Sequence, residues 1–260
     1  MHEGLQSGGA FQSGAPLIEE IETTLATSPT LWWLGRSGFV IRFANMTFYV
    51  DPVLSEPLLD PSAIHHADLI LCSHAHPGHM DGATLTAMLA ASPRAKVVMP
   101  KSAAEHARSL GIPFHRMTTT DSDLRVEFFK DGLYGRVYAV PSAHPELNYT
   151  PIGGYPQLGY LIRFERWTIY HAGDSVPYEG LAERLKPYNV NVALLPIAGK
   201  ANFTIQQAAQ LAGDIGAAWI VPMHYGTGDD SRFVAHLLGQ RPEQAFKVFR
   251  VGEKWTVPVE

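Results

Sequence analysis

A short apolar run that ends in a histidine cluster dominates this sequence: LILC followed by SHAHPGHMD, residues 69–81. The apolar run predicts a strand buried on both faces, and it stops abruptly before His74. A loop that follows such a strand is held by the rigid sheet and is a common location for a functional site. His74 and His76 alternate along the loop, and His79 returns to them after a Pro-Gly turn. Three converging imidazoles indicate a metal cation; a histidine-rich surface loop is the plainer alternative.

Three more candidate ligands lie far apart in the sequence, and each directly follows a predicted strand. They are His144, Asp174 and His224. Taken singly, each is more often an ordinary hydrogen-bonding residue than a ligand. Their common position at strand ends predicts that they meet the histidine cluster in one site.

The rest of the chain has two rounds of strands and helices, with no repeat and no linker. A helix is expected at Ala83–Ala91, and capping-box patterns at Ser102 to Glu105 and Thr204 to Gln207 predict two more. Phe246–Val251 and Trp255–Val257 are expected to form a closing pair of strands. We therefore predict a flexible tail over residues 1–16 and one α/β domain over residues 17–260, with two packed sheets and outer helices.

Composition excludes several classes of protein. The 260 residues contain 20 Lys and Arg against 25 Asp and Glu, a net charge of −5, which argues against nucleic-acid binding. The single cysteine, Cys72, cannot form an internal disulfide, and no apolar run approaches the roughly 20 residues of a membrane span. We expect a cytoplasmic protein with a small-molecule substrate, and an oligomer is compatible with the sequence.

The motifs in their order along the chain resemble those of the metallo-β-lactamase superfamily. Besides the histidine cluster, the resemblance rests on Trp33-Leu34-Gly35, Asp51-Pro52, Tyr170–Asp174 and Pro222–Tyr225, and it runs from about Leu31 to the C-terminus. These motifs look most like the branch that contains L-ascorbate-6-phosphate lactonase and N-acyl-phosphatidylethanolamine phospholipase D. The resemblance implies a four-layer αββα sandwich of two mixed sheets, with a two-metal site at the edge of the sheets.

The same resemblance implies a ligand set. By motif position, the first metal is held by His74, His76 and His144, and Asp174 bridges to a second metal held by His79 and His224. The chain departs from the family pattern at one position.

Gly78 stands where the family has an aspartate that binds the second metal. This departure implies weaker or optional binding of the second metal. Asp81 is a candidate substitute, although its position before a predicted helix favours an N-cap or a supporting role. Proton transfer falls to Asp174, Asp81 or the substrate.

The expected activity is hydrolysis of a lactone, a cyclic ester or amide, or a phosphodiester of a small metabolite by metal-bound hydroxide. Nitrogen-rich ligands favour Zn²⁺, one or two ions per chain, with Mn²⁺ and Fe²⁺ as alternatives. A protein that binds a metal or metabolite without hydrolysing it, and a nucleic-acid phosphodiesterase, are the rival functions.

Substrate contacts are less strongly indicated. Tyr149 and Tyr155 lie in a turn-rich segment after His144 and are lid candidates, or simply surface residues. Lys200 and Arg36 are candidates for binding an anionic substrate group, or plain solvated charges. His171, close to Asp174, is expected to support the ligands without binding the metal.

Overall fold

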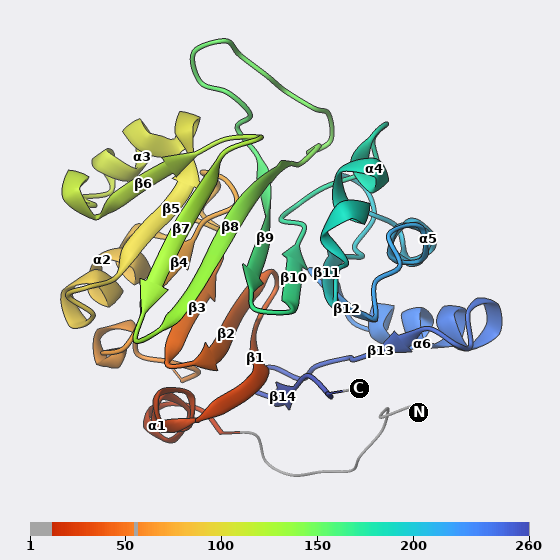
Figure 1. The fold of residues 1–260 in the computed structure, drawn as a ribbon, viewed down its shortest axis with the longest axis horizontal. Coiled ribbons are helices and arrows are strands. Elements are labelled where there is room, and N and C mark those ends of the chain that lie inside the picture. Colours follow the sequence, from red (N-terminus) through yellow and green to blue (C-terminus); the bar gives the residue numbers. More distant parts are fainter. Residues whose placement is uncertain (1–11, 55–56, 260) are drawn as a thin grey trace.

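Two seven-stranded sheets make up the centre of residues 12–54 and 57–259, the parts of the chain that the computed structural model describes (Figure 1). The first sheet has the spatial order β14 (Lys254–Thr256), β1 (Ala26–Gly35), β2 (Gly38–Ala44), β3 (Met46–Val50), β4 (Leu69–Leu71), β5 (Lys96–Pro100), β6 (Met117–Thr120). The second has the order β13 (Ala245–Phe246), β12 (Trp219–Met223), β11 (Val192–Pro196), β10 (Trp167–His171), β9 (Leu158–Phe164), β8 (Leu133–Pro141), β7 (Arg125–Lys130).

Both sheets are mixed, which confirms the predicted fold class. In the first sheet β14, β1, β2 and β3 pair antiparallel, and β3 to β6 pair parallel. In the second sheet β7 to β10 pair antiparallel, and β10 to β13 pair parallel.

Helices cover the outer faces of the two sheets. In Figure 1, α2 (Gly82–Ala91) and α3 (Ala104–Ser109) lie on one side, with α1 (Ala15–Thr23) below, while α4 (Leu181–Leu185), α5 (Ile205–Asp214) and α6 (Asp229–Gln240) lie on the other. Short 3₁₀ turns occur at Pro61–Ala63, Lys101–Ala103, Phe114–Arg116 and Lys186–Tyr188. The outer helices and the two sheets together form the predicted four layers.

In the first sheet, successive side chains of one strand pack into two different cores. In β1, Leu31 and Trp33 belong to the core shared with the second sheet, whereas Trp32 and Leu34 belong to the core beneath α1 and α2. Successive side chains of a strand point to opposite faces, so a continuous apolar run fills both cores.

Several predicted elements differ from the structure. Phe246–Val251 and Trp255–Val257 are not a pair, because β13 joins the second sheet beside β12 and β14 joins the first beside β1. The capping box at Ser102 is wrong, because Ser102 lies inside a 3₁₀ turn and Ala103 is the N-cap of α3. The predicted tail overlaps α1, which begins at Ala15, and residues 1–11 of that tail lie outside the described residues.

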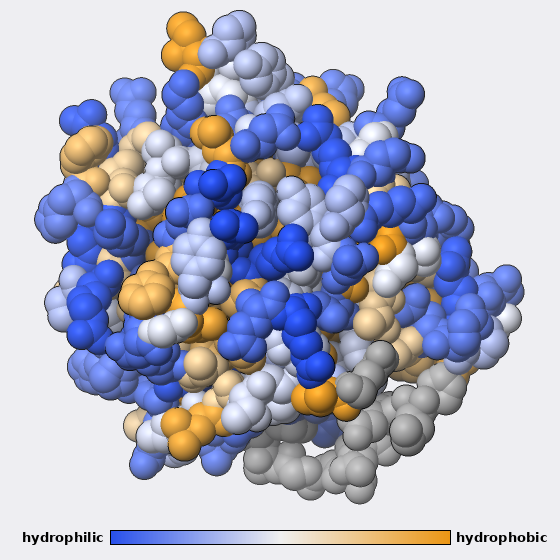
Figure 2. Space-filling view, viewed as in Figure 1, coloured by the Kyte–Doolittle hydropathy of each residue, from blue (hydrophilic) through white to orange (hydrophobic). Residues whose placement is uncertain are grey.

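The molecular surface carries few large apolar areas on the face drawn in Figure 2, where hydrophilic residues predominate. Hydrophobic surface is visible at the top, over the long loop between β8 and β9, where Ile152 is 85% exposed. Within the described ranges, none of the helices has the length and apolar character needed to cross a membrane.

Candidate metal centre

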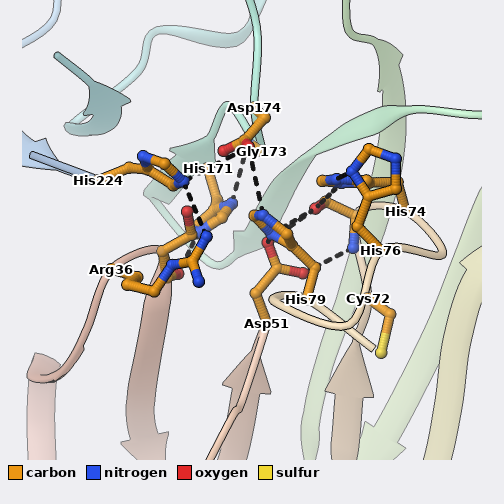
Figure 3. A network of polar contacts seen from close by, with 12 residues as sticks. Arg36, Asp51, Cys72, His74, His76, His79, His171, Gly173, Asp174 and His224 are labelled. Carbon is orange, nitrogen blue, oxygen red and sulfur yellow. Dashed lines mark hydrogen bonds and ion pairs between the residues drawn. The ribbon is translucent and has the colours of Figure 1, made fainter. Parts of the chain in front are cut away.

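The predicted ligands meet at one edge of the sandwich, because each lies just after a strand. His74, His76 and His79 follow β4, and the other three members of the set, which follow β8, β10 and β12, are His144, Asp174 and His224. Figure 3 shows side chains from both sheets pointing toward one another: those of His74, His76, His79, Asp174 and His224. The structure thus brings together residues up to 150 positions apart, from 74 to 224.

Two groups of side chains have the spacing of metal ligands. His74, His76 and His144 form one group, and His74, His79 and Asp174 form the other, with all ligand atoms of a group within 4.8 Å of one another. His74 Nε2 and His76 Nδ1 are 3.0 Å apart. Two nitrogens bound to one tetrahedral zinc at about 2.0–2.1 Å lie about 3.3 Å apart. The geometry of the first group therefore suits a single small cation.

In His144 and His74, a hydrogen bond at the outer ring nitrogen, Nδ1, leaves the inner nitrogen, Nε2, unprotonated and able to bind a metal. His144 Nδ1 donates to the carbonyl oxygen of Ala201 at 2.9 Å. His74 Nδ1 lies 3.0 Å from Ser73 Oγ, which donates its own proton to Asp51, so His74 is the donor in this pair. With Nδ1 protonated in both rings, Nε2 carries the lone pair that a cation binds.

Asp51 contacts the candidate ligands, although the sequence did not indicate it as a member of the site. Its carboxylate is 1% exposed and accepts hydrogen bonds from Ser73 N, Ser73 Oγ and His79 Nδ1, each at 2.7 Å. It thereby orients His79 directly and His74 through Ser73. A signal was available, since Asp51 directly follows β3, as the other site residues follow their strands.

Asp174 lies at the centre of the histidines and has one unpaired oxygen. Its Oδ2 is 3.3 Å from His79 Nε2, 3.5 Å from His224 Nε2 and 3.9 Å from His144 Nε2. Its Oδ1 is buried and has no hydrogen-bond partner among the described residues. A buried carboxylate oxygen without a partner is costly unless a cation or water binds it.

Charges within the site shift the pKa of its members in opposite directions. Burial alone raises the pKa of Asp174 and lowers that of His79, but their mutual attraction, with Asp51 on the other side of His79, outweighs burial. In the protein without metal the pKa of Asp174 is therefore lowered, and that of His79 is raised to about 9. Burial, followed by the charge of His79, lowers the pKa of His74 to about 3, so His74 is neutral.

These observations fit a divalent cation. Imidazole nitrogens and a carboxylate are ligands of Zn²⁺ and of other first-row metals, and the unpaired Asp174 Oδ1 gives the set an unused acceptor. His76 is exposed, so one side of the centre is open to solvent and to a substrate.

The remaining predicted site residues have varied positions. His171 is fully buried, and its Nε2 donates to the carbonyl of Ser37 while its Nδ1 accepts from the amide of Gly173, so it supports the turn that carries Asp174. Asp81 caps α2 by accepting from Thr84 N at 2.8 Å, and neither ligand group within the described residues contains it. Arg36 lies beside His224 in Figure 3.

The substrate candidates further from the histidines are exposed or partly exposed. Lys200 is exposed in the turn after β11, and Tyr149, 59% exposed, packs its ring 5.0 Å from that of Tyr155 in the loop between β8 and β9. The structure places these residues without showing a substrate contact, so their roles stay predictions.

Comparisons with known proteins show the family to which the chain belongs. The model of the beta-lactamase superfamily domain matches residues 30–224. A UPF0173 metal-dependent hydrolase of Myxococcus xanthus is 31% identical over 235 residues, covering 85% of this chain and 81% of the relative. A UPF0173 metal-dependent hydrolase of Anoxybacillus flavithermus is 30% identical over 230 residues, covering 86% of this chain and 97% of the relative.

A solved structure agrees at the level of the fold. Igni18, a metallo hydrolase from the archaeon Ignicoccus hospitalis, superposes with a TM-score of 0.73 at 22% identity, covering 90% of this chain and all of that one, 100%. The histidine and aspartate motifs, the two mixed sheets and the curated relatives lead to the same family. This chain belongs to the metallo-β-lactamase superfamily and, within it, to the UPF0173 metal-dependent hydrolases.

Proposed function

We propose that this protein is a metal-dependent hydrolase of small molecules and that His74, His76, His144 and Asp174 hold its catalytic cation. One observation carries the proposal: three imidazoles and a carboxylate converge, and one buried oxygen of the carboxylate has no partner within the part of the chain that the structure describes. A cation bound there lowers the pKa of water toward about 7 and polarises a carbonyl or phosphoryl oxygen.

The protein's own residues prepare this chemistry by fixing the ligands in advance. Ser73, Asp51 and the Ala201 carbonyl hold three of the rings, which removes the cost of ordering them when the cation binds. His79 Nε2 lies 3.3 Å from Asp174 Oδ2, and this contact fixes the orientation of the carboxylate.

Two features support a class of substrate: the solvent-exposed side of the candidate metal centre and the charge around it. A lactone, a cyclic ester or amide, or a phosphodiester fits a centre that supplies a hydroxide and an electrophile, and the guanidinium of Arg36 favours a substrate with an anionic group. Lactone hydrolysis comes first, on the resemblance to the L-ascorbate-6-phosphate lactonase branch. Zinc is the first candidate metal, with Mn²⁺ and Fe²⁺ next, because nitrogen ligands predominate.

A substrate screen tests the proposal. Purified protein, metal-free or loaded with Zn²⁺ or Mn²⁺, is assayed against panels of lactones, phosphodiesters and amides, with single-stranded DNA and RNA as additional arms. We expect metal-dependent turnover of a small molecule, lost in His76→Ala and retained in a matched control, His115→Ala, whose histidine is exposed in a 3₁₀ turn. Turnover that persists in His76→Ala contradicts the site assignment. Metal binding without turnover of any substrate favours the non-hydrolytic alternative.

A further inference from the structure

The guanidinium of Arg36 fills the space between His224 and Gly78. Its Nη2 lies 3.4 Å from His224 Nε2. A Cβ built on Gly78 would lie 3.0 Å from Nη2, 3.1 Å from Cζ and 3.2 Å from Nη1 of the same side chain. Any side chain at position 78 therefore meets the guanidinium at once.

The backbone does not explain why position 78 is a glycine. Gly78 does not have a positive φ, unlike eleven other glycines of the described ranges, such as Gly173 and Gly199. A non-glycine residue would adopt the same backbone without strain. The group that a side chain at position 78 would meet is the tip of Arg36, which would have to move by a few tenths of an ångström.

Hydrogen bonds hold the backbone of Arg36 in place. Arg36 has a left-handed φ of 47°, and its carbonyl oxygen accepts hydrogen bonds from Trp33 Nε1 and from His224 N, both at 3.0 Å. Trp33 in turn stacks on Tyr225 with ring centroids 5.3 Å apart. The turn after β1 is thus attached to the end of β12, and the guanidinium points to His224 from a short, anchored loop.

The contact with Arg36 uses the atom that His224 would offer to a metal. Arginine has no acceptor and stays protonated, so it donates and His224 Nε2 accepts. In agreement with this, neither ligand group among the described residues contains His224. A second divalent cation at this place would lose a ligand and face the positive charge of Arg36 at short range.

We infer that Arg36 takes the place of a second metal ion, so that the chain holds one catalytic cation with a guanidinium beside it. Arg36 and Gly78 then act together. Position 78 lacks the carboxylate that the family has there, and the guanidinium of Arg36 brings a positive charge into the space that this carboxylate would occupy. The N–H groups of Arg36 that do not face His224 remain for an anionic group of the substrate. The inference rests on the proposed metal site.

Metal content tests this inference without an activity assay. The wild type, Gly78→Asp, the double variant Arg36→Ala with Gly78→Asp, and the control Arg108→Ala, whose side chain is exposed on α3, are saturated with Zn²⁺, desalted and analysed by mass spectrometry of the metal. Titration with Co²⁺, followed by its visible absorption, gives a second count. Circular dichroism reports whether each variant is folded.

We expect one ion per chain in the wild type, in Arg108→Ala and in Gly78→Asp, where the new carboxylate pairs with Arg36. The double variant is expected to hold two. Two ions in the wild type or in Gly78→Asp overturn the inference, as does one ion in a folded double variant. If the double variant does not fold, the Gly78→Asp count decides, because this variant has a carboxylate at position 78 and still has Arg36. No ion in any variant overturns the proposed metal site itself and is distinguishable from these outcomes.

Discussion

His79 and Asp51 form a buried hydrogen bond of 2.7 Å between Nδ1 and Oδ2, with both side chains no more than 2% exposed. The bond turns His79 Nε2 toward Asp174, and the same carboxylate holds Ser73 and, through it, His74. Asp51 therefore connects the end of β3 to the ligands that follow β4 and β10.

Replacing Asp51 by asparagine should weaken metal binding, because an amide group cannot accept all three hydrogen bonds and carries no charge. Loss of such a partner of a metal ligand typically lowers metal affinity about 10- to 100-fold. Competition with a chelator measures the Zn²⁺ affinity. Asp60→Asn is a matched control, because Asp60 also accepts from the amide and hydroxyl of one serine, Ser62, but holds no histidine. Equal affinity in the two variants would contradict the role of Asp51.

His171→Leu should destabilise the protein, because it leaves the buried Ser37 carbonyl and the Gly173 amide without partners. Each unsatisfied buried group costs roughly 1–3 kcal/mol. The free energy of unfolding from urea titration of the metal-free protein should fall accordingly, and His115→Leu, on an exposed position, should change it little. A fall of the same size in both variants would show that His171 has no special role.

Asp81→Ala separates a helix cap from a catalytic group. Loss of the bond to Thr84 N should cost about 1 kcal/mol of stability, similar to Thr204→Ala at the N-cap of α5. Metal content and turnover should remain those of the wild type. Loss of metal or turnover in Asp81→Ala, but not in Thr204→Ala, would restore the predicted catalytic role of Asp81.

The metal-free protein should lose stability between about pH 6.5 and pH 9. The pKa of His79 is raised in the folded state from 6.5 to about 9, so folding favours its protonated form. The stabilisation is fully present below the unfolded pKa and disappears as the pH rises through the folded pKa. Urea titrations across this range should show the decline in the wild type and a flatter profile in His79→Gln; a decline of equal size in both would assign it to another group.

Much of the fold was predictable because strand burial is local in sequence. The run at residues 69–72 and the alternation in β1 follow from side chains that pack against the layers above and below. The pairing of the last two strands was not predictable, because β13 and β14 contact partners more than twenty residues away, in different sheets. Likewise, the capping box at Thr204 forms, whereas Ser102 fits the same pattern but lies within a 3₁₀ turn.

The meeting of the candidate ligands at one edge was predictable from motif and strand order, but the contacts between them were not. Nothing local shows that Asp51 reaches the histidines of the next strand, or that Arg36, in the turn after β1, lies against Gly78. These contacts depend on how neighbouring strands end at a common edge. For the same reason, the sequence showed only that Gly78 lacks the aspartate of the family, whereas the structure places the guanidinium of Arg36 against Gly78.

A crystal of the protein soaked in Zn²⁺ and measured at the zinc absorption edge tests the central claim most directly. We predict one anomalous peak per chain, within bonding distance of His74 Nε2, His76 Nδ1, His144 Nε2 and Asp174, with Arg36 still against Gly78. No peak at these residues, or a zinc bound by His224 with Arg36 displaced, would contradict it.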